Sequence, residues 1–363
     1  MSAEHLTGAL LWLCSIPSPI GEEAAICDAV FARLQGRPLA APMRRYGNSL
    51  VVPLTRAPTR SARRPHIALV GHLDTVRTEN GPARLESGRC FGAGASDMKS
   101  GLAVMLGIAE IGDPAKFPCD LTLVFYAKEE GPFADNELGP VLDQDPELAG
   151  VDLAVCLEPS DNRLHLGCTG SIHATVTFEG RTSHSARPWE GENAVYKAAP
   201  FLAELAARAP REAHIEGLVY RSVFTVTHAK DGGRGRNIVP DRFVLNLNHR
   251  FAPDTSLEVA QKSVIDMVAG RASVEFIDLS PAAMPNANHP LVRALVLAGV
   301  RGVEPKQAWT DVARFAARGV PAINFGPGEN AQAHQKNEST SLALLHDGFG
   351  IIERWLTSLA AQG

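Results

Sequence analysis

Short apolar runs alternate with amphipathic stretches over the first 170 residues of the chain. The runs at 67–70 and 121–126 are rich in β-branched and aromatic residues, which is typical of buried strands. The stretches at 22–34 and 99–111 repeat apolar residues at the spacing of an amphipathic helix. Strands that alternate with helices predict an α/β fold with a mostly parallel sheet covered on both faces. Further strands of this sheet are expected near 49–52 and 151–157.

The pattern changes after residue 170. The run Ile172–Phe178 alternates apolar and polar positions, as a half-exposed strand does. A helix, two strands, a second helix and a last strand are predicted after it, at 193–208, 222–227, 243–248, 257–268 and 273–277. This order is typical of a ferredoxin-like unit, in which helices cover one face of an antiparallel sheet.

The first pattern returns after Pro281, with a helix from Leu291, a second helix over 312–317, a strand at 321–325 and a closing helix from Leu342. The mostly parallel sheet predicted for the first 170 residues is thus interrupted in the sequence by the ferredoxin-like unit and completed after it. We therefore predict a discontinuous, mostly parallel α/β domain with an inserted α+β ferredoxin-like domain. The predicted boundaries are 1–169 and 280–363 for the first domain and 170–279 for the insert.

Composition and charge exclude several classes of protein. The 363 residues are many for a single core, and the net charge of −5 argues against a nucleic-acid partner. No segment approaches the ~20 apolar residues of a membrane span, and the short apolar run at 9–14 is interpreted as a core helix rather than a signal peptide. The six cysteines form no Cys-x-x-Cys pair, so we expect buried reduced thiols and a cytoplasmic protein.

Candidate ligands for a metal follow the predicted strands. Ligands of open α/β sheets bind beyond the carboxyl ends of the strands, so polar groups there are expected to converge. The donor set has two histidines, several carboxylates and no thiolate, which suits zinc and tolerates cobalt or manganese. These carboxylates are too many for one ion, whereas two ions that share a carboxylate would neutralise them. The candidates are His72, Asp74, Asp97, Glu129, Glu130, Glu158 and His334.

Each of these features has a simpler explanation when it is taken alone. A buried histidine or aspartate in a glycine loop is usually structural, and adjacent glutamates usually form a solvated turn. The glycine-rich run at 92–94 lacks the spacing of a phosphate-binding loop. The metal site is favoured because four separate strand ends each supply a residue that can bind a metal.

Five segments together resemble the motifs of the co-catalytic zinc amidohydrolases and peptidases. This family includes aminoacylases, acetylornithine deacetylase and succinyl-diaminopimelate desuccinylase. The segments are His72–Val76, Asp97–Gly101, Glu129–Gly131, Glu158–Pro159 and His334-x-x-Asn337-Glu338. Three more segments, at 182–189, 248–254 and 308–315, are most similar to desuccinylases of the actinobacterial type. The resemblance implies a zinc-dependent catalytic domain and an insert that serves as a lid and in dimerisation.

The resemblance also assigns metal ligands. It implies that Asp97 bridges two zinc ions, that His72 and Glu158 hold one ion, and that Glu130 and His334 hold the other. Cobalt or manganese would be substitutes for zinc.

Catalytic and substrate-binding roles follow from the same resemblance. Glu129 would be the general base, and Asp74 would orient the ring of His72. His184 would reach the active site of the partner subunit in a homodimer and stabilise the oxyanion. The implied substrate-binding residues are Asn237, Arg250, Asn330 and Thr310.

The function implied is hydrolysis of an N-acyl amino-acid amide, with N-succinyl-LL-2,6-diaminopimelate as the leading substrate. This small, carboxylate-rich molecule would yield succinate and LL-2,6-diaminopimelate for lysine and cell-wall biosynthesis. Arg77 stands where the family often has proline, and Ala308–Val312 replaces the Gly-Thr-Ser-Asp-Gly of proteobacterial desuccinylases. Acetylornithine deacetylase, an acyl-lysine deacylase and a dipeptidase or carboxypeptidase therefore remain alternatives. A non-catalytic homologue that binds a metal or ligand is a remote one.

Overall fold

The computed structural model of the protein describes residues 2–56, 64–233 and 235–359, which form two units. The first unit comprises the described residues up to Gly167, Pro285–Pro305, and those from Asp311 onward. The second comprises Cys168–Met284 and Lys306–Thr310. The short segment 306–310, which lies outside the insert predicted at 170–279, thus groups with the second unit. The catalytic and lid roles of the two parts stay predictions.

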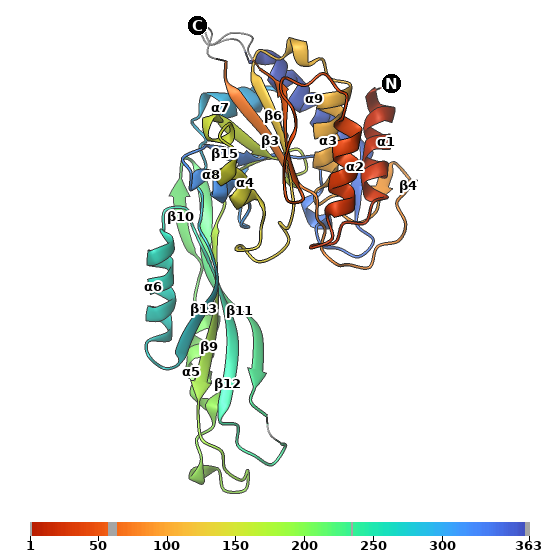
Figure 1. The fold of residues 1–363 in the computed structure, drawn as a ribbon. Coiled ribbons are helices and arrows are strands. Elements are labelled where there is room, and N and C mark those ends of the chain that lie inside the picture. The colour runs from red at the N-terminus through yellow and green to blue at the C-terminus, as the bar shows by residue number, and fades with distance from the viewer. Residues whose placement is uncertain (1, 57–63, 234, 360–363) are drawn as a thin grey trace. The chain divides into compact units, whose positions relative to one another are not determined.

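A mixed, mostly parallel sheet forms the centre of the first unit (Figure 1). Its strands are β1 (Arg44–Tyr46), β2 (Ser49–Thr55), β3 (His66–His72), β6 (Asp120–Tyr126), β7 (Leu153–Cys156), β8 (Leu164–Leu166), β14 (Val303–Pro305) and β15 (Ala322–Asn324). Their order is β1-β2-β6-β3-β7-β15-β8-β14. β6, β3, β7 and β15 are parallel neighbours, whereas β1 and β2 pair antiparallel at one edge. The predicted α/β class is confirmed.

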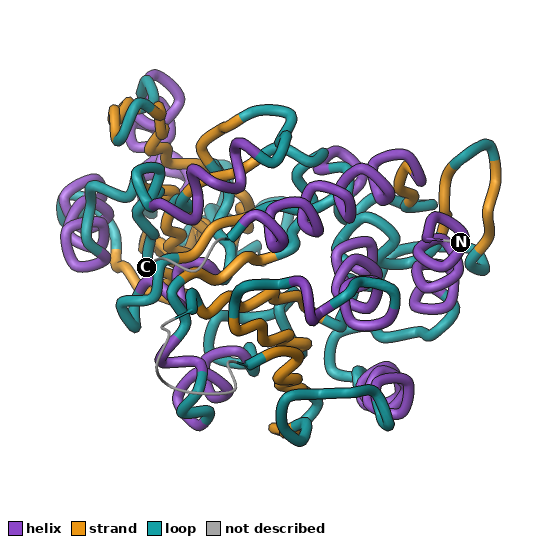
Figure 2. The backbone as a smooth tube through the Cα atoms, turned by 90° about the horizontal axis from the view of Figure 1, so that it is seen from above, coloured by secondary structure: helices purple, strands orange, loops and turns teal. Residues whose placement is uncertain are grey.

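Helices lie on both faces of this sheet (Figure 2). They are α1 (Ser2–Cys14), α2 (Ala24–Leu34), α3 (Lys99–Glu110), α4 (Leu138–Gln144), α7 (Pro290–Leu297), α8 (Val312–Ala316) and α9 (Leu342–Ser358). Short 3₁₀ turns are η1 (Pro114–Lys116), η2 (Leu148–Gly150) and η4 (Asn330–Gln332). α3 packs against β3 on one side and is covered by α1 and α9, so that it is buried from Lys99 to Ala109. α8 packs against β7 and β15.

A glycine allows α3 to approach the end of β7. A Cβ atom on Gly101 would lie 2.4 Å from the backbone oxygen of Leu157, closer than real Cβ atoms come to other atoms. The first turn of α3, which follows Asp97, therefore lies directly against the segment that leads to Glu158. A separate three-stranded sheet, β16-β5-β4, joins β4 (Arg84–Glu86) and β5 (Arg89–Phe91) to β16 (Ser339–Ser341).

The second unit is a five-stranded antiparallel sheet with helices over one face. Its elements are β9 (Gly170–Glu179), η3 (Pro188–Glu190), α5 (Ala194–Ala207), β10 (Arg211–Ile215), β11 (Leu218–Asp231), β12 (Arg242–Phe251), α6 (Leu257–Val268) and β13 (Ser273–Ser280). The order is β10-β11-β12-β9-β13, in which the last four strands follow the predicted ferredoxin-like arrangement. The inward face of β9, from Ile172 to Phe178, packs with α5 and α6 in one apolar core.

β10 was not predicted. Its sequence, Arg-Glu-Ala-His-Ile, carries three polar side chains, and it alternates polar and apolar residues over only four positions, too few to indicate a strand clearly. It forms because the hairpin through Glu216 and Gly217, both with positive φ, folds it onto β11.

Two further expectations are tested by the structure. The six cysteines, all of which the structure describes, are buried thiols outside any disulfide, as predicted. Among the residues that the structure describes, no helix combines the length and apolarity needed to cross a membrane.

Candidate metal centre

The ends of three parallel strands bring the first candidates together. β3 ends at His72, β6 ends three residues before Glu129, and β7 ends two residues before Glu158. Because β6, β3 and β7 are adjacent and parallel, their carboxyl ends open at the same edge of the sheet. This is the edge at which the sequence predicts the chemistry.

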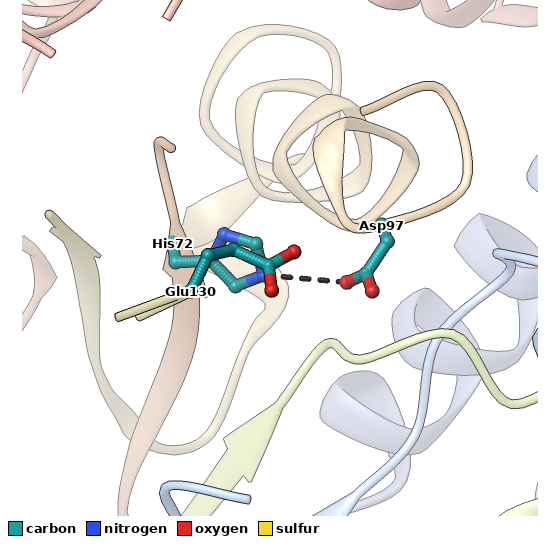
Figure 3. Close-up of side chains that lie close together, drawn as sticks. All are labelled: His72, Asp97 and Glu130. Carbon is teal, nitrogen blue, oxygen red and sulfur yellow. Dashed lines mark hydrogen bonds and ion pairs between the residues drawn. The ribbon is translucent and has the colours of Figure 1, made fainter. Parts of the chain in front are cut away.

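A tight cluster of donor atoms forms at this edge (Figure 3). One potential ligand atom from each of His72, Asp97 and Glu130 lies within 4.8 Å of the others. The Nε2 atom of His72 lies 3.3 Å from Oδ1 of Asp97, and the imidazole is fully buried. Burial lowers the pKa of His72, but the hydrogen bond to Asp97 and the nearby carboxylates outweigh it and raise this pKa well above its usual value. The site therefore favours positive charge.

His334 joins the cluster from a segment more than 200 residues further along the chain. Its Nε2 atom lies 2.9 Å from Oε2 of Glu130 and 3.5 Å from Oδ2 of Asp97. The hydrogen bond to Glu130 raises the pKa of His334 to about 9. The two oxygens of Asp97 thus face two different imidazoles, which is the arrangement that a carboxylate shared by two cations requires.

Half-buried Glu129 and buried Glu158 lie beside this cluster. Burial raises the pKa of Glu129 well above its usual value, and the charge of Glu158 adds to this effect, while His72 opposes it. Glu158, which is 5% exposed, also raises the pKa of His72. Glu158 lies outside the 4.8 Å group formed by His72, Asp97 and Glu130.

Asp74 supports the site through both its backbone and its side chain. Its backbone oxygen lies 2.9 Å from Nδ1 of His72, whereas its carboxylate Oδ1 is 3.6 Å from the same nitrogen. A proton on Nδ1 that is donated to this carbonyl leaves the Nε2 lone pair free for a metal. The carboxylate accepts the backbone N–H groups of Glu129 and Glu130, at 3.0 and 2.9 Å. It therefore holds the turn that carries both glutamates.

Another buried carboxylate near the site, that of Asp311, was given no role in the sequence analysis. Asp311 accepts hydrogen bonds from the Tyr126 hydroxyl at 2.7 Å, from the Asn136 side chain at 2.8 Å and from Arg314 Nε at 2.5 Å. Arg314 also donates to the backbone oxygen of Phe133. This network fixes the loop after Glu129 to α8. Its residues are scattered through the sequence, so no local pattern indicates it.

Two of the predicted functional residues lie together in the second unit. His184 and Ile238 form an isolated β-bridge, and Ser185 donates its backbone N–H to the backbone oxygen of Asn237. His184 and Asn237 are both exposed. His184 accepts the backbone N–H of Ala186 through Nδ1, at 3.0 Å.

The other candidates of the second unit lie elsewhere in it. Arg250 lies near the end of β12 that is far from Asn237. Arg242 begins the strand at the end near Asn237, and Arg250 follows it by eight residues, or about 27 Å. Thr310 is buried, and its backbone oxygen contacts the sulfur of Cys168 at 3.7 Å. The remaining candidate, Asn330, belongs to the first unit, where it is exposed in η4.

Comparison with known proteins agrees with this chemistry. The family model of peptidase family M20/M25/M40 matches residues 68–358 of this chain. The chain belongs to this peptidase family. A putative succinyl-diaminopimelate desuccinylase of Mycobacterium tuberculosis H37Rv is 37% identical over 355 residues, which cover 97% of each protein. The succinyl-diaminopimelate desuccinylase of Corynebacterium glutamicum is 35% identical over 95% of this chain and 94% of its own.

A solved structure shares the fold of this chain. The aminopeptidase PepT from Bacillus cereus superposes with a TM-score of 0.80 and covers 99% of both chains at 18% identity. This likeness concerns the fold.

The donor set of this M20 member fits divalent zinc. Two imidazoles and several carboxylates are ligands that zinc accepts, and the buried carboxylates need cations for neutrality. The raised pKa values of His72 and His334 indicate surroundings that favour positive charge, which a bound cation would supply.

Proposed function

We propose that this member of the M20/M25/M40 family hydrolyses N-succinyl-LL-2,6-diaminopimelate to succinate and LL-2,6-diaminopimelate. The observation that carries this proposal is the 37% identity, over 97% of both chains, with the putative succinyl-diaminopimelate desuccinylase of Mycobacterium tuberculosis. The cluster of His72, Asp97 and Glu130 supports it, because a metal centre can activate the water that attacks an amide. We place the reaction in the cytoplasm, where the six buried thiols would stay reduced.

We propose a pair of zinc ions as the resident metals, with cobalt or manganese as substitutes. Asp97 would bridge the ions, His72 and Glu158 would hold one, and Glu130 and His334 the other. The contacts of both Asp97 oxygens with separate imidazoles support this assignment. When bound, the zinc pair would lower the pKa of a water and polarise the amide carbonyl.

Glu129 is proposed as the general base. It would take a proton from the attacking water and later deliver it to the leaving amine. Its raised pKa supports this role, because a carboxylate must hold the proton between the two steps. The hydrogen bond from the Glu129 backbone to Asp74 would keep the carboxylate aimed at the reacting atoms.

Substrate recognition is proposed to involve Asn237, Arg250, Asn330 and Thr310. The guanidinium of Arg250 suits a substrate with three carboxylates, since it can bind one in bidentate fashion. The protein would act as a homodimer in which His184 stabilises the oxyanion in the partner's active site.

A substrate panel tests this proposal. Metal-free protein would receive one and then two equivalents of zinc, and be assayed with succinyl-diaminopimelate, acetylornithine, an acyl-lysine and several dipeptides. We expect the highest kcat/KM for succinyl-diaminopimelate and full activity only after the second equivalent. A higher kcat/KM for another member of the panel would reassign the substrate. Lack of hydrolysis of every member would refute the proposed activity.

A further inference from the structure

Glu338 binds the backbone of the loop that carries Asp97. Its Oε2 atom accepts the backbone N–H of Gly94 at 2.8 Å. Its Oε1 atom accepts the backbone N–H groups of Ser96 and Asp97, each at 2.8 Å. The carboxylate is 2% exposed, so little water competes for these three hydrogen bonds.

The backbone of Glu338 binds the surrounding structure as well. Its carbonyl accepts the N–H of Gly92 at 3.0 Å, and its N–H donates to Oδ1 of Asn80 at 2.8 Å. β16 begins at the next residue and pairs with β5. Glu338 is thus a fixed point from which the loop before α3 is held.

The chemistry of this contact requires an anion. Successive backbone N–H groups that converge on one point form a nest for negative charge. A carboxylate offers only acceptors, with about four lone-pair sites, so it can take all three donors. A glutamine of the same shape would turn an NH₂ group toward at least one N–H, and a donor would then face a donor.

We propose that Glu338 is a positioning residue that fixes the shared carboxylate of Asp97 and thereby sets the affinity for the second metal ion. This inference rests on the two-ion centre proposed above. The Oδ atoms of Asp97 must stay within reach of both His72 and His334, which are 3.3 and 3.5 Å away. Because Glu338 holds the N–H of Asp97 itself, it limits how far this side chain can move.

The effect should be larger for the ion assigned to Glu130 and His334. Glu338 lies four residues after His334, so a single short segment both presents that imidazole and anchors the Asp97 loop. Loosening this segment would disturb two ligands of that ion at once. The ion assigned to His72 and Glu158 keeps ligands from β3 and from the end of β7, which Glu338 does not touch.

The test measures zinc binding as well as activity. Glu338→Gln would be titrated with zinc in competition with a chromophoric chelator, beside the wild type. We expect the weaker of the two zinc affinities to fall 10- to 100-fold and the tighter one to change by less than threefold. Cobalt-substituted protein should show an altered visible absorption spectrum at two equivalents and a normal one at one equivalent.

Two further variants separate this role from a general loss of stability. Glu110→Gln removes another buried carboxylate, at the other end of α3 and about 16 Å along the helix, and should leave both zinc affinities unchanged. Glu338→Asp keeps the charge but is one methylene shorter, so it should fold and still weaken the second zinc ion.

The outcomes distinguish this inference from the proposed function. Wild-type affinity for both ions in Glu338→Gln and Glu338→Asp would overturn the positioning role alone. A wild type that takes up only one zinc ion would overturn the two-ion centre and this inference with it. Loss of the second ion in the variants would support the inference even if the preferred substrate proved to be another amide.

Discussion

At the residue scale, the site depends on carboxylates that do different work although they are close in space. Asp97 faces two imidazoles, whereas the carboxylate of Asp74 accepts two backbone N–H groups and lies 3.6 Å from Nδ1 of His72. Glu129 and Glu130 are neighbours in sequence, yet only Glu130 contacts His334. A ligand and a base can therefore come from adjacent positions.

Replacing Glu129 with glutamine should remove the base and leave the metal ligands in place. We expect kcat to fall by about 10²- to 10⁴-fold, the usual contribution of a general base, with two zinc ions still bound. Steady-state kinetics and metal analysis of the same sample would measure both quantities. Activity close to that of the wild type would show that another group takes the proton.

At the element scale, a partly buried ion pair joins three helices of the first unit. Glu110, at the end of α3, accepts hydrogen bonds from Arg33 of α2 at 2.7 and 2.8 Å, and its Oε2 lies 2.5 Å from the His5 ring of α1. Burial opposes the charge on Glu110, but Arg33 and His5 lower its pKa below the usual value. The cluster should stabilise the helices without touching the metal ligands.

Glu110→Gln should therefore lower the free energy of unfolding by about 1–3 kcal/mol at neutral pH. Because the folded-state pKa of Glu110 is lowered, its contribution is fully present above the unfolded value near 4.5 and is lost as pH falls through the folded value. Urea denaturation at pH 7, 5 and 4 would measure the difference between variant and wild type. A difference in the free energy of unfolding that grows as the pH falls would contradict the predicted pH dependence.

Most long elements agree with their sequence patterns, and so do the short elements β7, α8 and β15, whereas several other three-residue strands were not predicted. Strand β3, helix α3 and helix α6 were expected close to their observed bounds. β4, β8 and β14 have three residues each, too few for a period to show. β11 extends to Asp231, beyond the predicted end at 227. Its polar residues there pair with β12, so the strand continues without the alternation of buried and exposed positions on which the prediction relies.

At the scale of the whole molecule, the dimer proposed above would make one active site depend on two chains. His184 belongs to the second unit and Glu129 to the first. If His184 acts on the partner's substrate, two different inactive variants can form one intact site between them.

Mixing Glu129→Gln and His184→Ala subunits after reversible dissociation should restore activity. Random reassociation makes half of the dimers mixed, with one intact site of two, so about a quarter of wild-type activity is expected. Mass spectrometry of the intact dimers would verify exchange, and each variant alone is the control. Mixed dimers without recovered activity would place His184 outside the partner's active site.

The sequence by itself determined the order of the long helices and strands, because their hydrophobic period is a local property that each segment carries. It also indicated candidate metal ligands, since His72 and Glu130 follow apolar strands whose carboxyl ends must meet. The tertiary structure alone decided which distant groups support them. Glu338 reaches Asp97 across 241 positions and Asp311 reaches Tyr126 across 185, and such hydrogen bonds leave no periodic trace in the chain. The separation of Arg250 from Asn237 within the second unit likewise follows from strand register, which is fixed only when the sheet assembles.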